Sequence, residues 1–135
     1  MQDCLFCKII AGEIPAYKVY EDKDVLAFLD ITPANPGHTL VVPKMHYKNL
    51  LELPSELSNK LIGVVKNISP AIIKGVGSTA FNVRQNNGQL AGQSVNHFHW
   101  HVIPRFESDG YELWPGKEYP EGGAEEALKK IKEYL

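Results

Sequence analysis

Histidine occupies every second position in one short segment of the chain, which reads His97-Phe98-His99-Trp100-His101-Val102-Ile103. Successive side chains of a β-strand point to opposite faces of a sheet. In a strand, the three histidines of this segment would therefore lie on one face, and the apolar residues between them would lie on the other. The pattern predicts a half-buried strand, expected over residues 95–103, that presents three imidazoles in a row.

Such a row of histidines has three possible uses. A neutral imidazole is a good nucleophile near pH 7, and a neighbouring imidazole can hold its tautomer or move a proton. Imidazole is also a common ligand of protein-bound metals. The row could instead be a solvated or hydrogen-bonded face without a chemical role. The two remaining histidines, His38 and His46, flank another expected strand and could meet the same face across the sheet.

The rest of the chain predicts an α+β fold with an antiparallel sheet. We expect a helix over 4–11 capped by Asp3, strands over 17–21, 25–29 and 38–43, a helix over 55–74, strands over 80–84 and 95–103, and a helix over 124–135. Pro70 should bend or end the long helix, because proline lacks an amide donor and its ring clashes with the preceding turn. Short connections and the absence of a linker indicate one domain over residues 1–135.

Composition narrows the class of protein. The 135 residues are 44% hydrophobic and 22% charged, as in an ordinary globular domain. A net charge of −2 argues against a nucleic-acid surface built on bulk charge. No apolar run is long enough to span a membrane, and the first residues do not form a signal peptide, so we expect a cytoplasmic protein. Cys4 and Cys7 then suit a metal site, a redox pair or two small packed side chains better than a structural disulfide.

The histidine segment resembles the signature of the histidine-triad (HIT) family, H-φ-H-φ-H-φ-φ, in which φ is apolar. Other segments match in the family's order: Phe6-Cys7-Lys8-Ile9-Ile10, Phe28-Leu29-Asp30-Ile31, Pro36-Gly37-His38 and Gly92-Gln93-Ser94-Val95. The chain is most similar to the bacterial and Hint-like members. The resemblance implies a five-stranded antiparallel sheet with one long helix, a short N-terminal helix and a C-terminal helix.

The resemblance also implies an activity. Members of the family bind purine nucleotides and remove a substituent from the α-phosphorus through a nucleotidyl-histidine intermediate, which water then hydrolyses. His99 matches the nucleophile, while His101 and His38 match residues that contact the phosphate or orient the nucleophile. Ser94 resembles the contact to the leaving group. Covalent catalysis of this kind divides one difficult substitution into two easier ones.

A wider set of residues resembles the family's nucleotide contacts. The set is Phe6, Ile9, Phe28, Asp30, Ile31, Asn86, Gln93, Ser94, His99 and His101. Within it, Asp30 matches a carboxylate that accepts hydrogen bonds from the ribose, although an Asp at a strand end is also an ordinary turn residue. Gln93 and Asn86 match phosphate and ribose contacts. The apolar members match the walls around the base, and each could equally be ordinary core.

The N-terminal cysteines gain a function from the same resemblance. Some members of the family hold a tetrahedral zinc ion with two cysteines and two histidines, and the matching positions are Cys4, Cys7, His46 and His97. In a helix, positions i and i+3 share a face, so both sulfur atoms would point the same way. Two cysteines and two histidines form a closed structural zinc set, and we expect one zinc ion per chain. A redox pair would instead suit a thioredoxin-like βαβ unit, which is not expected here.

The leaving group and the class of function stay open at this stage. Pro104-Arg105 resembles members that hydrolyse dinucleoside polyphosphates, whereas Trp114-Pro115-Gly116 is similar to the tail that shapes substrate choice in the phosphoramidase branch. The family pattern is a homodimer. The alternative to an enzyme is a zinc-stabilised nucleotide-binding dimer with a regulatory role. A metalloenzyme that uses the three histidines as ligands is disfavoured, since no Asp or Glu lies between Asn82 and Arg105.

Overall fold

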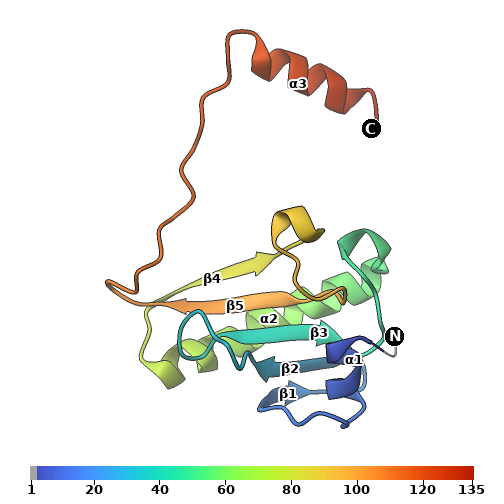
Figure 1. Cartoon of the computed structure of the whole chain (residues 1–135), viewed down its shortest axis with the longest axis vertical. Helices are drawn as coiled ribbons and strands as arrows, with labels where there is room; N and C mark the ends of the chain where they lie inside the picture. The colour runs from blue at the N-terminus through green and yellow to red at the C-terminus, as the bar shows by residue number, and fades with distance from the viewer. Residues whose placement is uncertain (1–2) are drawn as a thin grey trace.

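The protein forms a five-stranded antiparallel sheet with three α-helices, in a computed structural model that describes residues 3–135 (Figure 1). The strands are β1 (Lys18–Glu21), β2 (Val25–Leu29), β3 (Thr39–Pro43), β4 (Ala80–Gln85) and β5 (Trp100–Arg105), arranged in the order β1-β2-β3-β5-β4. The helices are α1 (Leu5–Ile10), α2 (Ser55–Val76) and α3 (Gly123–Lys132), with short 3-10 helices at Leu50–Glu52 and Gln89–Ala91. This architecture confirms the predicted α+β class.

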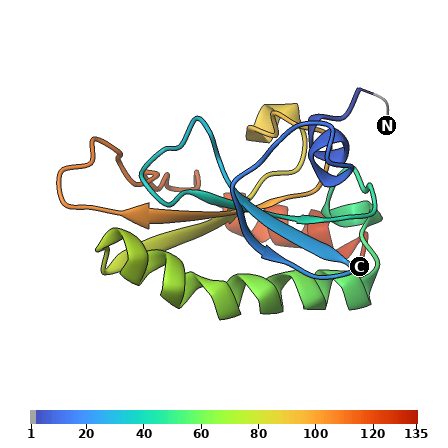
Figure 2. The same cartoon turned by 90° about the horizontal axis from the view of Figure 1, so that it is seen from below.

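The two faces of the sheet carry separate cores. Figure 2 shows α2 along one face and α1 on the opposite side. Alternate side chains of the strands supply each core, since the side-chain period of a strand is two residues. The buried residues on the α2 side are Val25, Ala27, Val41, Leu53, Leu61, Val64, Val65, Ile72, Phe98 and Val102, and those on the α1 side are Phe6, Ile9, Leu26, Phe28, Leu40 and Val42.

The helices differ from those predicted: α3 ends at Lys132 rather than at residue 135, and α1 and α2 differ as follows. The side chain of Cys4, not that of Asp3, caps α1 by accepting a hydrogen bond from the backbone amide of Cys7 at 3.4 Å. The long helix α2 continues through Pro70 to Val76, with buried positions both before and after the proline. It ends at Gly77, whose left-handed φ of 73° allows its amide to bond the carbonyls of the last turn. Packing of the buried face outweighs the hydrogen bond that Pro70 cannot make.

The strand that carries the histidines begins later than predicted. β5 starts at Trp100, so His97 and His99 lie in the irregular segment that precedes it. The backbone amide of Phe98 donates to the carbonyl of Tyr47 at 2.7 Å, a contact outside the sheet ladder. The predicted alternation of faces nevertheless holds. Phe98 is buried on the α2 side, while the His97 and His99 rings stack edge-on against Phe6 of α1, with ring centroids 5.9 and 5.1 Å away.

The C-terminal part of the chain leaves the sheet. After β5, the chain turns and runs as an extended segment to α3, which lies apart from the rest of the protein (Figure 1). No side chain of α3 is buried, although Leu128 and Ile131 are apolar. Residues 107–135 are called the C-terminal arm below. None of the helices within residues 3–135 is long and apolar enough to cross a membrane.

Candidate active site and metal centre

A cavity of about 280 Å³ opens between α1 and the sheet. Its lining consists of Leu5, Phe6, Ile9, Ile14, Pro15, Ala16, Phe28, Leu29, Asp30, Ile31, Thr32, Leu40, Ser94, Val95, His99 and His101. We call it the α1 cavity. It brings together every predicted nucleotide contact except Asn86 and Gln93. The wall is mainly apolar and one end is polar, which suits a planar base attached to a charged group.

His99 lies at the polar end of the α1 cavity with its tautomer set by the backbone. Its Nδ1 atom is 2.7 Å from the carbonyl oxygen of His97. A carbonyl oxygen only accepts hydrogen bonds, so Nδ1 carries the proton and donates it. In the neutral ring, the lone pair then resides on Nε2. Burial lowers the pKa of His99, which keeps the imidazole neutral at pH 7. The residue therefore has the electronic form that a nucleophile needs.

His38 and His101 form a directed pair beside it. The backbone amide of Ala34 donates to Nδ1 of His38 at 3.0 Å, so neutral His38 carries its proton on Nε2. That atom lies 2.8 Å from Nδ1 of His101 and donates to it. Neutral His101 must then carry its own proton on Nε2, as a hydrogen-bond donor to a ligand. Burial lowers the pKa of His101 to about 3 and also lowers that of His38, so both rings are neutral at pH 7.

Asp30 and Ser94 are the other polar residues of the α1 cavity. One carboxylate oxygen of Asp30 accepts hydrogen bonds from the amide and hydroxyl of Thr32, at 2.9 and 3.2 Å, so Asp30 is the turn residue that the sequence allowed. Its other oxygen lies 3.8 Å from Nε2 of His38 and is available to a ligand. Among residues 3–135, the Ser94 hydroxyl has no hydrogen-bond partner. Both side chains can therefore serve a bound molecule without breaking internal bonds.

The predicted contacts Gln93 and Asn86 lie outside the cavity. Gln93 is buried, and its amide group is used internally: the oxygen accepts from the amide of Gly88 at 2.8 Å, and the nitrogen donates to the carbonyl of Lys48 at 2.7 Å. Asn86 donates to a backbone carbonyl of the same loop at 3.4 Å. In this structure, Gln93 anchors the loop that presents Ser94. A sequence pattern cannot separate such an anchor from a ligand contact.

The four predicted zinc ligands converge at the other end of α1. Nδ1 of His97 lies 3.4 Å from Sγ of Cys4, 3.6 Å from Sγ of Cys7 and 3.1 Å from Nδ1 of His46. Sγ of Cys7 lies 3.4 Å from Nδ1 of His46. Zinc–ligand bonds of about 2.0–2.3 Å in a tetrahedron separate the ligands by roughly 3.3–3.8 Å. The three separations given that involve a sulfur atom lie within this range, and the two histidine nitrogens, at 3.1 Å, are slightly closer.

His97 is oriented for ligation by its second nitrogen. Nε2 donates to the carbonyl oxygen of Pro43 at 2.8 Å, which leaves the lone pair on Nδ1, the atom that faces the two sulfurs. Burial lowers the pKa of His97 to about 4, so the ring stays neutral and free to bind a metal. Asp30, His38 and His101 also group closely enough for a metal ion. In that group, however, Nε2 of His38 and Nδ1 of His101 are hydrogen-bonded to each other, so they are not free to ligate a metal ion.

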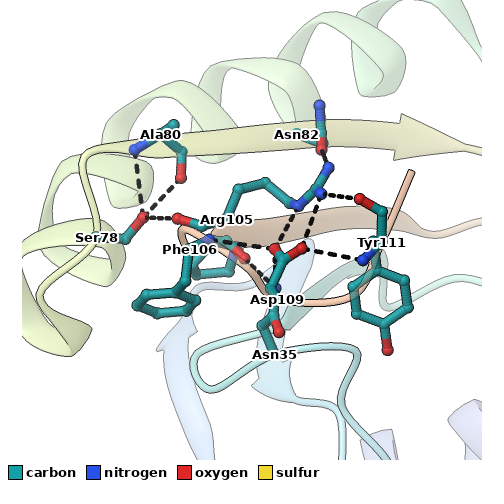
Figure 3. Close-up of polar contacts among 9 residues, drawn as sticks. Asn35, Ser78, Ala80, Asn82, Arg105, Phe106, Asp109 and Tyr111 are labelled. Atoms are coloured by element: carbon teal, nitrogen blue, oxygen red, sulfur yellow. Dashed lines mark hydrogen bonds and ion pairs between the residues drawn. The ribbon is translucent and has the colours of Figure 1, made fainter. Parts of the chain in front are cut away.

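An ion pair between Arg105 and Asp109 holds the turn that leads from β5 into the C-terminal arm (Figure 3). Arg105 donates to both oxygens of Asp109, at 2.7 and 3.0 Å. Asp109 also accepts from Asn35 at 2.9 Å and from the amides of Phe106 and Tyr111. The guanidinium and these donors hold the pKa of Asp109 well below its usual range. Sequence reasoning missed this turn, although an oppositely charged pair four residues apart was a visible signal.

Comparison with known proteins places these features in a family. A family model described as the HIT domain matches residues 11–108. A HIT-like protein of Methanocaldococcus jannaschii is 53% identical over 130 residues, which cover 96% of this chain and 98% of the relative. An adenosine 5'-monophosphoramidase of Schizosaccharomyces pombe is 42% identical over 120 residues, covering 87% and 85% of the two chains.

Solved structures agree with the whole fold. The crystal structure of a member of the HIT family from Bacillus subtilis superposes with a TM-score of 0.89 at 42% identity, covering 98% of this chain and 97% of that one. A zinc-bound histidine triad family protein from Mycobacterium smegmatis superposes with a TM-score of 0.77 at 34% identity, covering 99% of each chain. The structural similarity therefore extends over the sheet, the helices and the C-terminal arm.

Proposed function

The chain belongs to the HIT-domain family, and from this premise we propose that it is a hydrolase that removes a substituent from the α-phosphate of a purine nucleotide. The observation that carries the proposal is the free Nε2 atom of His99 at the polar end of an apolar cavity. A protein that only bound nucleotides would have no need of a buried, neutral imidazole with its lone pair directed at the ligand. The phosphoramidase activity named for the Schizosaccharomyces pombe relative is consistent with this chemistry.

In the proposed reaction, the base occupies the α1 cavity and the ribose hydroxyls donate to Asp30. Nε2 of His99 attacks the α-phosphorus, and a phosphorus–nitrogen bond forms. The bond from phosphorus to the substituent breaks, and the leaving group takes its electron pair together with a proton from the donors beside it, which the water of the second step replaces. The Nε2–H group of His101 and the hydroxyl of Ser94 donate to the phosphoryl oxygens and the leaving group as negative charge develops there.

The second half of the reaction regenerates the enzyme. Water attacks the phosphorus of the nucleotidyl-His99 intermediate, and the phosphorus–nitrogen bond breaks with its electron pair returning to Nε2. One proton of the water is released, and the product is a nucleoside monophosphate. Throughout the cycle, the carbonyl of His97 keeps the proton on Nδ1 of His99, so that Nε2 can again act as the nucleophile.

We also propose that Cys4, Cys7, His46 and His97 bind one structural zinc ion per chain. The proposal rests on the convergence of two thiols and two imidazole nitrogens, with His97 oriented by Pro43. A bound ion would cross-link the start of α1, the segment after β3 and the segment before β5. Because His97 supplies the carbonyl that orients His99, the zinc ligands and the nucleophile share one short segment of backbone. These four side chains would supply all the ligands of a tetrahedral zinc ion and leave no open position for catalysis.

A homodimer is the third part of the proposal. Residues 107–135 form about a fifth of the chain, and a superposition that omitted them could not reach the TM-score of 0.89 found with the Bacillus subtilis structure. The arm is therefore held in one place there, although α3 buries none of its side chains in its own chain. A second copy can supply the missing contact, since β4 is an edge strand with Phe81 and Val83 exposed.

Turnover of adenosine 5'-phosphoramidate by the wild type and by His99→Ala tests the enzymatic proposal. We expect the variant to lose at least about a thousandfold in kcat, because no other side chain can form the covalent intermediate. The variant should still bind AMP with an affinity within a few-fold of the wild type, which controls for folding. A wild type that binds AMP but releases no product from any adenylyl substrate would contradict the proposal and favour a regulatory nucleotide-binding protein.

A further inference from the structure

His38 lies at the end of the loop over residues 30–38, which joins β2 to β3. Two other residues of this loop hold it in place. The backbone amide of His38 donates to the carbonyl of Asn35 at 3.1 Å, and its ring accepts at Nδ1 from the amide of Ala34 at 3.0 Å. The direction of the hydrogen bond from His38 to His101 therefore depends on where residues 34 and 35 lie.

The side chain of Asn35 attaches this part of the loop to the end of β5. Asn35 is buried, and its Nδ2 atom donates to the carbonyl of Pro104 at 2.9 Å and to Oδ2 of Asp109 at 2.9 Å. The loop is also tightly packed, since a Cβ atom added at Gly37 would lie 2.8 Å from the Val76 side chain and 3.2 Å from that of Pro104. Directed hydrogen bonds and close packing together leave the loop little freedom to shift.

Asp109 is the buried carboxylate that accepts the hydrogen bond from Asn35 (Figure 3). Its side chain is only 5% exposed, and Arg105 donates to both of its oxygens. The guanidinium also donates to the side chain of Asn82 in β4 at 3.0 Å and to the carbonyl of Tyr111 at 2.9 Å. Moving either partner of such a pair is costly, because it leaves a buried charge without its hydrogen bonds. Asp109 is therefore a fixed acceptor for Asn35.

These contacts form a closed ring that begins and ends in β5, the strand that contains both His101 and Arg105. From Arg105, the contacts pass to Asp109 and then to Asn35. From Asn35, they pass through the loop to His38 and so back to His101. The strand that carries the proposed phosphate donor thus also holds the loop that sets the tautomer of this donor.

We propose that Asn35 and Asp109 are positioning residues, which hold the loop so that His38 donates its Nε2 proton to His101. The inference rests on the proposed function, in which the Nε2–H group of His101 donates to the phosphoryl oxygens. If the loop shifts, the bond from His38 weakens, and neutral His101 can carry its proton on Nδ1 instead, where it faces His38. A donor that is already oriented needs no reorganisation as charge develops in the transition state. Both residues lie outside the lining of the α1 cavity, so they act on turnover rather than on binding.

The tautomer of His101 can be measured from the imidazole nitrogen chemical shifts of protein labelled with nitrogen-15 histidine at neutral pH. In the wild type, we expect a protonated Nε2 and a bare Nδ1. In Asn35→Ala, both tautomers should be populated. Asp109→Asn keeps the side-chain volume but offers one oxygen instead of two, so it should change the tautomer ratio in the same direction and to a smaller extent. Ser78→Ala is the matched control, because it removes a hydroxyl that donates to the carbonyl of Arg105 at 2.7 Å, at the same end of the sheet but outside the loop.

Kinetics of a double variant show whether Asn35 acts through His38. Asn35→Ala should lower kcat for adenosine 5'-phosphoramidate by about tenfold, because the donor is misplaced in part of the molecules, and it should change KM little. In a His38→Ala background, the same substitution should have no further effect on kcat, since the bond that it positions is already absent. Equal losses in the two backgrounds would reveal a general structural effect and would overturn the proposal.

The inference and the proposed function fail in different ways. The same single tautomer of His101 in the wild type and in Asn35→Ala would overturn the positioning role, and turnover that depends on His99 would then leave the proposed function intact. A wild type that turns over no adenylyl substrate would overturn the proposed function, and with it the part of the inference that concerns kcat.

Discussion

Nε2 of His38, the residue before β3, donates to Nδ1 of His101 in β5 over 2.8 Å. Together with the amide of Ala34, this bond fixes the direction of a short relay that ends in a donor at the proposed phosphate site. The first prediction follows from it. His38→Ala frees His101 to adopt the other tautomer, so its donor is lost in part of the molecules. We expect kcat for adenosine 5'-phosphoramidate to fall about 10- to 100-fold, while the affinity for AMP changes less.

A second substitution of His38 separates the effect of losing its hydrogen bond to His101 from the effect of losing its side-chain volume. His38→Gln offers a side-chain amide that can donate to Nδ1 of His101, and it should recover more of kcat than His38→Ala. Steady-state kinetics of the two variants measure the difference. Equal loss in both would show that the relay direction does not matter.

The second prediction concerns the pH dependence of kcat/KM. Catalysis needs neutral His99, and burial lowers the pKa of this residue below its ordinary 6.5. Activity should therefore stay level as the pH falls from 8 through 6.5 and decline only at lower pH. The charge of Asp30 opposes that shift by raising the pKa of His99. Asp30→Asn should thus move the acid limb to lower pH, in addition to any loss of substrate affinity. An acid limb of kcat/KM with its midpoint at pH 6.5 or above would contradict a buried, neutral His99 as the nucleophile.

The third prediction concerns stability. The folded-state pKa values of His97 and His101 are lowered to about 4 and about 3, whereas unfolded histidine has its ordinary pKa near 6.5. Between these values the unfolded chain binds more protons, so the free energy of unfolding decreases as the pH falls from 6.5 toward 4. We expect a loss on the order of a few kcal/mol over this range. Urea titrations of the metal-free protein measure it, and a stability that is flat or rises toward pH 4 would contradict the buried neutral histidines.

Much of the site follows from residue types and spacing alone. The alternation around His99 predicts which side chains face α1, and the structure confirms those faces even where the strand itself is absent. Resemblance to the family predicts the four zinc ligands, which do converge. The start of β5 was not predictable, because it depends on the bond from the amide of Phe98 to the carbonyl of Tyr47, residues 51 positions apart in the chain.

The tautomers could not be predicted for a related reason. They are set by three backbone groups, which are the carbonyls of His97 and Pro43 and the amide of Ala34. Almost any residue type offers the same backbone groups, so the sequence carries no signal for them. Gln93 shows the converse problem, since a buried anchor and a ligand contact look alike in a sequence. The continuation of α2 past Pro70 depends on tertiary packing, which cannot be read from the helix propensity of the local sequence.

The fourth prediction tests the zinc site. Cys7→Ser should lower the zinc content of the purified protein from about one per chain to well below one, because a hydroxyl is a much weaker zinc ligand than a thiolate. Loss of the ion should reduce the melting temperature by roughly 10 °C. Metal analysis and thermal unfolding check both. Ser94→Ala, which changes a hydroxyl at the other site, is the matched control. Wild-type protein prepared without chelator that holds no zinc would contradict the site.

The fifth prediction tests the arm. Ile131→Asp places a charge on the apolar side of α3, where Leu128 and Ile131 are both exposed. We expect the homodimer to weaken by at least about tenfold, while the melting temperature of the dissociated chain stays the same. Lys132→Gln changes the net charge by the same single unit at an adjacent exposed position and should have a smaller effect. Sedimentation velocity at micromolar concentration gives the oligomeric state, and a monomeric wild type would remove the dimer from the proposal.

The nucleotidyl-His99 intermediate is the central claim, and its capture is the most direct test. Adenosine 5'-phosphoramidate would be mixed with the enzyme and quenched within the first turnovers, and the peptide that contains residues 97–101 analysed by mass spectrometry under non-acidic conditions, since phosphorus–nitrogen bonds are acid-labile. We expect one adenylyl group on this peptide, located at His99, and none in His99→Ala. Product release by the wild type with the adenylyl group on another residue, or with no modified peptide at any quench time, would contradict nucleophilic catalysis by His99.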